Sequence, residues 1–117
     1  MTDNSEILQM QNDEFRGRIM LPAFGKPAIQ GSYLYTRGIV ALGAEAQIII
    51  AAKVRDFDSF SEDNDPHGEH DFGSFNYEGQ KIFWKIDYYD TEYQYGSADP
   101  ADPTKTRLYV VRVFWTS

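Results

Sequence analysis

Two periodicities of apolar residues divide the chain into expected elements. A helical spacing between Ile7 and Phe15, preceded by residues that cap helix N-termini well, predicts an amphipathic helix over residues 4–16. The same spacing from Leu42 onward produces a broader apolar stripe. It predicts a second, well-buried helix over residues 43–56.

A period of two predicts strands in the second half of the chain. Residues 72–77 and 80–88 flank Glu78-Gly79, a dipeptide that favours a two-residue hairpin turn. The terminal run, residues 107–115, is apolar on both faces, which is typical of a central strand. The sequence therefore predicts an antiparallel hairpin followed by a buried strand.

The first half of the chain has weaker strand signals. Residues 18–21 form a short β-rich run that Pro22 closes, and residues 22–31 hold two prolines and two glycines, which indicates a loop. Residues 33–40 form a second β-rich run, in which Gly38 suggests a bulge. Each of these two runs adds one expected strand.

Together these elements predict the fold class. Two helices and four to six strands, mostly joined by short turns, are typical of an α+β fold. We expect a single antiparallel sheet with the two helices packed on one face. The length of 117 residues fits one domain, residues 1–117.

Charge is distributed unevenly along the chain, and this distribution indicates which classes of partner to expect. The net charge is −7, yet residues 1–55 carry five acids and six bases, whereas residues 56–117 carry thirteen acids and five bases. Such a field repels nucleic acid and favours basic partners, although acids also keep an aromatic-rich surface soluble. The bases are scattered, so we expect no direct binding of nucleic acid.

Composition and the N-terminal residues bear on location. The chain has no cysteine, which excludes disulfides and thiolate metal sites and fits a reducing compartment. Its polar, acidic start is unlike a signal peptide, and no apolar run approaches the roughly 18 residues that span a bilayer. We expect a cytoplasmic protein with no membrane contact and no cofactor.

One stretch concentrates the residues that can do chemistry. Six ionisable side chains fall within nine positions: Asp63, Asp65, His67, Glu69, His70 and Asp71. Turn-forming residues between them favour a structural loop, and the exposed carboxylates favour a surface that contacts a partner. A third reading is a metal site with His67, His70 and Asp71 as ligands and Glu69 orienting a water.

A second group follows on the predicted hairpin: Lys85, Asp87, Tyr88, Tyr89 and Asp90. Lys85 and Asp87 lie two apart and so share a sheet face, which favours a surface ion-pair network. Tyrosines among carboxylates also suit a binding surface, because they supply contact area at low entropic cost. In the metal reading, Lys85 would stabilise developing negative charge.

Three stretches resemble a known family: NDPHGEHDFG at 64–73, FWKIDYYD at 83–90 and GSADPADPTKTR at 96–107. The chain resembles an uncharacterised bacterial family, domain of unknown function 3768. A weaker likeness runs back to residues 12–16 and 36–39, while the loop with Pro22 and Pro27 and the terminal VVRVFWTS depart from the family pattern. The resemblance implies a setting on proteobacterial mobile elements and implies no reaction.

These observations favour a small, acidic, non-catalytic interaction protein. We expect it to bind a basic surface of another protein, as an inhibitor of bacterial nucleic-acid defence such as restriction or CRISPR systems. The alternative is a metal-dependent hydrolase built on the His67/His70/Asp71 loop. A homodimer that pairs through the edge of the terminal strand is a further hypothesis.

Overall fold

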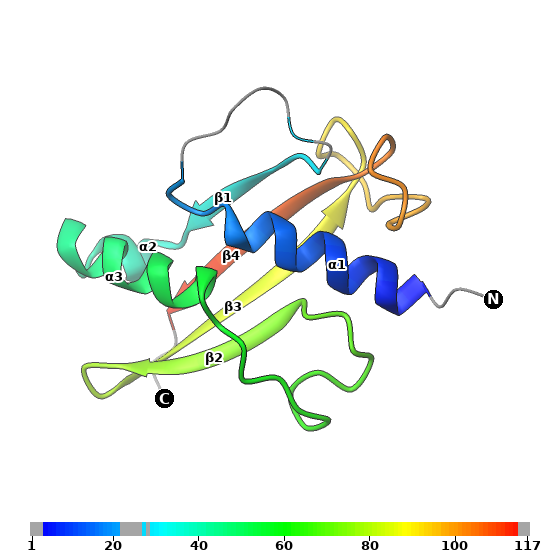
Figure 1. The fold of residues 1–117 in the computed structure, drawn as a ribbon. Coiled ribbons are helices and arrows are strands. Elements are labelled where there is room, and N and C mark those ends of the chain that lie inside the picture. The colour runs from blue at the N-terminus through cyan, green and yellow to red at the C-terminus, as the bar shows by residue number, and fades with distance from the viewer. Residues whose placement is uncertain (1–3, 22–26, 28, 115–117) are drawn as a thin grey trace.

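The computed structural model describes residues 4–21, 27 and 29–114, and it has an α+β architecture (Figure 1). The elements in chain order are α1 (Asn4–Gly17), β1 (Gly31–Tyr35), α2 (Arg37–Val40), α3 (Ala44–Arg55), β2 (Phe72–Tyr77), β3 (Gln80–Tyr89) and β4 (Arg107–Phe114). Within the described residues, no helix is long and apolar enough to cross a membrane.

The four strands form one sheet in the order β1-β4-β3-β2. The pairs β2–β3 and β3–β4 are antiparallel, but β1 runs parallel to β4. The prediction of a purely antiparallel sheet is therefore wrong. The reason lies in the connection through α2 and α3, which returns the chain so that β2 runs in the same direction as β1. Because β3 reverses that direction and β4 reverses it again, β4 ends parallel to β1.

The core lies between the helices and the inward side of β3. Ile82, Trp84 and Ile86 alternate along β3 and are at most 3% exposed. They pack in one cluster with Phe15 of α1 and with buried residues of α3. In Figure 1, α1 and α3 lie on the same side of the sheet. The period of two in β3 therefore sets which strand face meets the helices.

The strongest sequence patterns predicted their elements well. The helices expected at 4–16 and 43–56 are α1 and α3, with bounds that differ by one residue. The hairpin is confirmed, with Glu78 and Gly79 in its turn at positive φ. The terminal strand is confirmed as an interior strand, because β4 pairs on both sides.

The strand expected at 18–21 is wrong, because these residues form turns after α1. The amide of Ile19 donates to the carbonyl of Arg16, and that of Leu21 donates to the carbonyl of Arg18. Ile19 is 2% exposed and joins the core, so its apolar character reflects burial in a turn. A four-residue apolar run does not distinguish these cases by periodicity.

The strand expected at 33–40 is also only partly correct. The extended part ends at Tyr35, and residues 37–40 form the single helical turn α2. This turn carries Ile39 into the core, where it is fully buried, and Gly38 lies in α2 and marks no bulge. Most of the loop expected at 22–31 lies outside the described residues, and its last residue, Gly31, begins β1.

The interior position of β4 also bears on the expected dimer. A strand that pairs with β1 on one side and β3 on the other offers no free edge to a second copy. The expected pairing through this strand therefore finds no free edge among the described residues, and the homodimer itself stays a prediction. Among the described strands, the open edges of the sheet are β1 and β2.

Candidate functional site

The acidic loop, residues 56–71, is closed by its own side chains. Asp65 is 8% exposed, and its Oδ1 accepts the amides of Glu69 at 3.1 Å and His70 at 3.2 Å. The Asn64 side chain accepts the amide of Ser61 at 2.9 Å and donates to the carbonyl of Ser59 at 2.9 Å. Turn-forming residues thus hold this loop in one shape, as their short polar side chains favour. Asp65 is buried and supports the backbone of the loop, and its expected contact with a partner stays a prediction.

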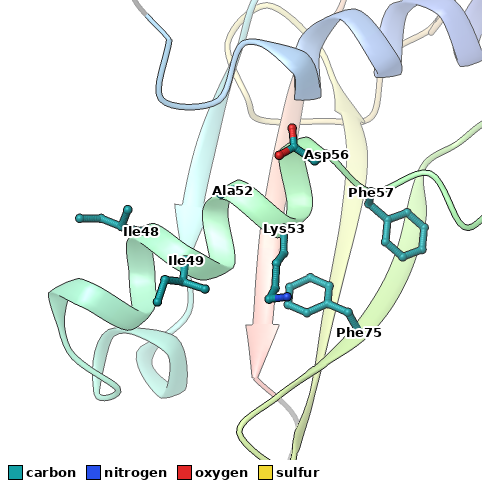
Figure 2. Close-up of a pocket in the computed structure, with 7 residues that line it drawn as sticks. All are labelled: Ile48, Ile49, Ala52, Lys53, Asp56, Phe57 and Phe75. Atoms are coloured by element: carbon teal, nitrogen blue, oxygen red, sulfur yellow. The ribbon is translucent and has the colours of Figure 1, made fainter.

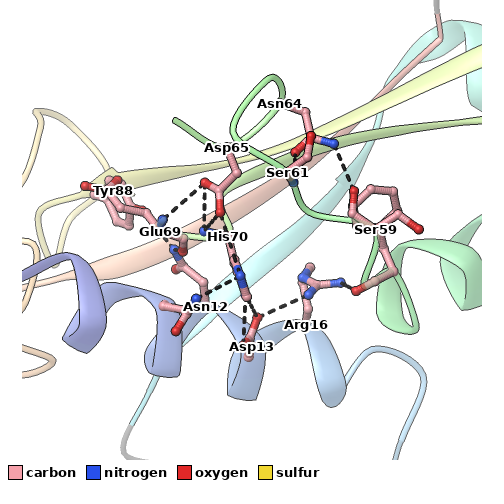
Figure 3. A network of polar contacts seen from close by, with 12 residues as sticks. Asn12, Asp13, Arg16, Ser59, Ser61, Asn64, Asp65, Glu69, His70 and Tyr88 are labelled. Carbon is pink, nitrogen blue, oxygen red and sulfur yellow. Dashed lines mark hydrogen bonds and ion pairs between the residues drawn. The ribbon is translucent and has the colours of Figure 1, made fainter. Parts of the chain in front are cut away.

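His70 ties the acidic loop to α1 (Figure 3). Its Nδ1 lies 2.9 Å from Oδ1 of Asp13, and its Nε2 lies 2.8 Å from Nε2 of Gln9. A neutral ring with its proton on Nδ1 satisfies both contacts, since Nδ1–H donates to Asp13 and Nε2 accepts from the Gln9 amide. The ring also stacks on Phe60, with centroids 3.8 Å apart. Both nitrogens are thus engaged within the fold.

Asn12 and Tyr88 join the same loop to the sheet. The Asn12 amide donates to the carbonyl of Glu69 at 2.9 Å and to the Tyr88 hydroxyl at 2.8 Å. The hydroxyl in turn donates to Oδ2 of Asp71 at 3.4 Å. Burial raises the pKa of Tyr88, so the phenol keeps its proton and remains a donor. Burial, and then the neighbouring Asp71, also raises the pKa of Glu69.

Arg16 extends this network to the end of α3. The residue is 3% exposed, and its Nη1 donates to the carbonyls of Val54 at 2.6 Å and Phe57 at 3.0 Å. Its Nη2 donates to Asp13 at 3.2 Å, and the guanidinium lies 4.7 Å from the centroid of the Trp84 ring. Arg16 therefore adds a charged donor to two carbonyls at the C-terminal end of α3, and the Val54 carbonyl also accepts the amide of Phe57 at 3.4 Å.

The two histidines do not converge. His67 is exposed, whereas His70 is turned toward α1. Within the described part of the chain, no group of three or more His, Cys, Asp or Glu side chains is placed to hold a metal ion. The expected ligand set of His67, His70 and Asp71 is thus not brought together. Asp63 is exposed beside them, and Glu69 and Asp71 are half-buried.

The second expected group is split between different surroundings. Lys85 and Asp87 form an ion pair at 3.4 Å along one strand, both partly exposed. Tyr88 belongs to the inward network, and Asp90 accepts the amides of the following turn through Oδ1. Tyr89 contacts the Tyr93 ring at 6.3 Å between centroids. These residues do not form one site, and surface ion pairs of this kind contribute little to stability.

The polar residues of α1 had not been expected in the site. Gln9 and Asp13 contact the His70 ring, and Asn12 contacts the carbonyl of Glu69, across 57 to 61 residues of chain. Arg16 joins this group through its bond to Asp13. A signal for them exists in the pattern, because Asn12 and Arg16 are buried beside Leu8 and Phe15 on the apolar stripe of α1. A polar residue inside such a stripe indicates a buried polar contact.

The topology brings two acid-rich loops to one end of the sheet. β2 begins, β3 ends and β4 begins at this end, so the acidic loop and residues 90–106 both lie here. α1 contacts both loops, through His70 and through a 2.8 Å bond from Gln11 to the carbonyl of Ala101. Figure 1 shows the two loops on either side of the first half of α1.

We define the acidic end by four exposed carboxylates from these loops: Glu62, Asp63, Glu92 and Asp99. Among the described residues, none of the four forms an ion pair with lysine or arginine. Hydrogen bonds from Thr104 lower the pKa of Asp102, and the positive charge of Lys105 lowers it further. Lys105 is exposed on this loop. The surface at this end therefore keeps most of its negative charge.

Comparisons with known proteins place this chain in a family. Searches of curated proteins and of solved structures found no match. Residues 35–116 match the family described as Protein of unknown function (DUF3768), and this region runs from the end of β1 through both acid-rich loops to β4. The match covers more than half of the chain, so the protein belongs to the DUF3768 family.

Proposed function

We propose that this chain is a non-catalytic binding protein whose acidic end docks on a basic surface of another macromolecule. The observation that supports this most strongly is the convergence of two acid-rich loops at one end of the sheet. The four carboxylates of the acidic end lack lysine or arginine partners among the described residues. A concentrated field of one sign attracts a partner of the opposite sign and raises the rate of association.

The structure of the loops suits this role. No lysine or arginine occurs between Arg55 and Lys81, whereas eight acids do. Asn64 and Asp65 hold the shape of the acidic loop, and His70 ties the loop to α1. The exposed carboxylates of the loop therefore lie on an ordered backbone. Ordering before binding lowers the entropic cost of association.

The finer proposal concerns the class of partner. Carboxylates spaced along an ordered surface can occupy a groove that otherwise binds phosphates. The partner we propose is a nucleic-acid-binding protein of bacterial defence, such as a restriction or CRISPR component, which this chain would inhibit. The support is the charge distribution and the mobile-element setting that the family resemblance implied.

A pair of charge-reversal variants tests the proposal. Glu62→Lys with Asp63→Lys changes the acidic end, and Glu45→Lys with Glu78→Lys makes the same change in net charge elsewhere. Both control positions lie near Tyr77, at the end of the sheet opposite the acidic end. Their proximity shows in the pKa of Tyr77, which burial raises and which the carboxylates of Glu78 and Glu45 raise further.

The measurement is capture of partners from a bacterial lysate by each immobilised variant. We expect the wild type and the control variant to retain the same basic protein, and the acidic-end variant to lose it. Added salt and duplex DNA should both release that protein, because both compete for a phosphate-binding surface. The proposal would be contradicted if the two variants captured equal amounts of the protein, or if added salt did not reduce the amount retained.

A further inference from the structure

The strand β2 presents an open row of backbone groups at the margin of the sheet. The two-residue turn makes Tyr77 and Gln80 a hydrogen-bonded pair, and the amide of Ile86 donates to the carbonyl of Asp71 at 2.8 Å. Every second residue of β2 therefore bonds to β3. The N–H and C=O groups of the alternate residues, Phe72, Ser74 and Asn76, point away from the sheet. In the described part of the chain, no strand pairs with this side of β2.

An apolar groove of about 510 Å³ adjoins this edge. Its walls are one side of α3 and the inward side of β2, as Figure 2 shows, and five of the residues that line it are apolar: Ile48, Ile49, Ala52, Phe57 and Phe75. Ile48 is 60% exposed, so its side chain is accessible to a molecule that enters the groove. A strand added to β2 would turn every second side chain toward this groove.

The edge of β2 lacks the features that usually prevent strand addition. Natural edge strands are protected by lysines, prolines or bulges. Residues 72–77, FGSFNY, contain no charged residue and no proline, and their register with β3 is unbroken. This edge is therefore able to accept an extended segment.

Charge decides which segment fits. Asp56 lines the groove and is paired with Arg55 at 2.9 Å, and the strand is preceded by the acidic loop, which contains no lysine or arginine. A second copy of the chain would bring another net charge of −7 to this edge, so repulsion disfavours it. A segment with lysines or arginines at one end would meet these carboxylates favourably.

We propose that the edge of β2 and the adjoining groove bind an extended basic segment of a partner protein, which adds a fifth strand to the sheet. Alternate apolar side chains of the segment fill the groove below α3. The basic residues lie at the end nearest Asp56 and the acidic loop. This inference rests on the proposed function, because it gives the same basic partner a second contact.

Lys53 limits the chemistry inside the groove. Its ammonium lies 6.0 Å from the centroid of the Phe75 ring, on the wall that α3 and β2 share. A basic side chain within the groove would approach this ammonium, whereas an apolar side chain would pack against the stem of Lys53. The basic residues of the segment are therefore excluded from the middle of the groove.

The test uses a defined probe, an acetylated peptide of alternating valine and threonine with three lysines at one end. We expect the wild type to bind it with a Kd below about 1 mM in an NMR titration. Ser74→Pro should weaken binding at least about tenfold. The Ser74 amide points away from β3, so proline removes a bond to the peptide and none within the sheet. Ile48→Gln should also weaken binding, and Met10→Gln, at an exposed site on α1, should not.

Amide exchange on the wild type provides a readout that needs no variant. The amides of Phe72, Ser74 and Asn76 should exchange more slowly when the peptide is bound, because only these point toward an added strand. Unchanged exchange at the three amides, or no binding up to about 1 mM, would overturn the inference. A dimer that dissociates in Ser74→Pro would also overturn it, because the occupant would then be a second copy.

The acidic-end variant separates this inference from the proposed function. If Glu62→Lys with Asp63→Lys abolishes capture of the cellular partner while Ser74→Pro does not, the proposed function stands and strand addition is wrong. If Ser74→Pro abolishes capture and the acidic-end variant does not, strand addition stands and docking through the acidic end is wrong.

Discussion

Gly73 illustrates how closely single residues are fitted at the junction of α3 and the sheet. A Cβ built on this glycine would lie 2.5 Å from Nε1 of Trp84 and 2.8 Å from the Phe57 ring. Trp84 is fully buried, and its ring packs edge-on against Phe57 at 5.5 Å between centroids. Glycine at this position of β2 is therefore needed for close packing, and not for an unusual backbone angle.

Gly73→Ala should destabilise the protein by about 1–3 kcal/mol, because Trp84 and Phe57 must move to admit a methyl group. The measurement is the midpoint of urea unfolding. Gly17→Ala serves as a control, since nothing lies within 4 Å of a Cβ at that position. A loss at Gly73 no larger than that at Gly17 would show that the core adapts to the methyl group.

Glu69 predicts a pH dependence whose sign follows from its surroundings. Burial and the nearby Asp71 raise its pKa above the ordinary value of 4.5. The folded state therefore holds this proton more tightly than the unfolded chain does. The stabilisation it contributes is complete below the unfolded-state pKa and is lost as the pH rises through the folded-state pKa.

Glu69→Gln cannot ionise and should keep this contribution at every pH. We expect its melting temperature to exceed that of the wild type by about 1–3 °C near neutral pH, and to match it in acid below the unfolded-state pKa. Glu45→Gln, an exposed position in the first turn of α3, should show no such difference. Equal melting temperatures at neutral pH would mean that Glu69 ionises freely in the fold.

At the scale of elements, α1 connects several distant parts of the molecule. One side of it supplies core residues, and its polar side chains reach the acidic loop, the end of α3 and the second acid-rich loop. Arg16 is the link to α3, because it donates to two carbonyls at the C-terminus of that helix. A substitution of Arg16 in α1 should therefore destabilise the C-terminal turn of α3.

Arg16→Met should cost about 1–3 kcal/mol of unfolding free energy, since it removes a charged donor from the carbonyls of Val54 and Phe57, although Val54 keeps a 3.4 Å bond from the Phe57 amide. Amide exchange should accelerate in the last turn of α3 and change little in the β2–β3 hairpin. Arg55→Met, which removes a surface ion pair with Asp56, should cost about 1 kcal/mol or less. A similar loss for both variants would argue against a capping role for Arg16.

Across the whole molecule, the distribution of charge has a measurable effect on stability. Two loops of like charge converge at the acidic end, and their carboxylates repel one another in the folded state. The repulsion weakens when salt screens the charges, with a screening length of about 10 Å at 0.1 M ionic strength. The native state should therefore gain stability from salt.

We expect the melting temperature of the wild type to rise by about 2–5 °C between low ionic strength and about 0.3 M NaCl. The rise should be smaller than that of the wild type in the variant Glu62→Lys with Asp63→Lys. In the control variant, Glu45→Lys with Glu78→Lys, the rise should equal that of the wild type. Thermal unfolding followed by circular dichroism measures all three proteins. An identical salt response would mean that the carboxylates at the acidic end are too far apart to interact.

Local patterns determined much of this fold before the structure was known. The hairpin of β2 and β3 follows from alternation on both sides of Glu78-Gly79, because turn and register involve neighbours in sequence. The helices α1 and α3 follow from a period that spans three or more turns. Short runs were less informative, since residues 18–21 and 36–40 take their conformation from the burial of Ile19 and Ile39.

The sequence by itself determined the helices α1 and α3, the hairpin, the interior terminal strand and an excess of acid in the second half of the chain. The tertiary structure alone decided that β1 runs parallel to β4, that His70 contacts Asp13 across 57 residues of chain, and that both acid-rich loops share one end of the sheet. The physical reason is that periodicity and turn chemistry act between neighbours, whereas these outcomes depend on chain direction and on contacts closed through the core.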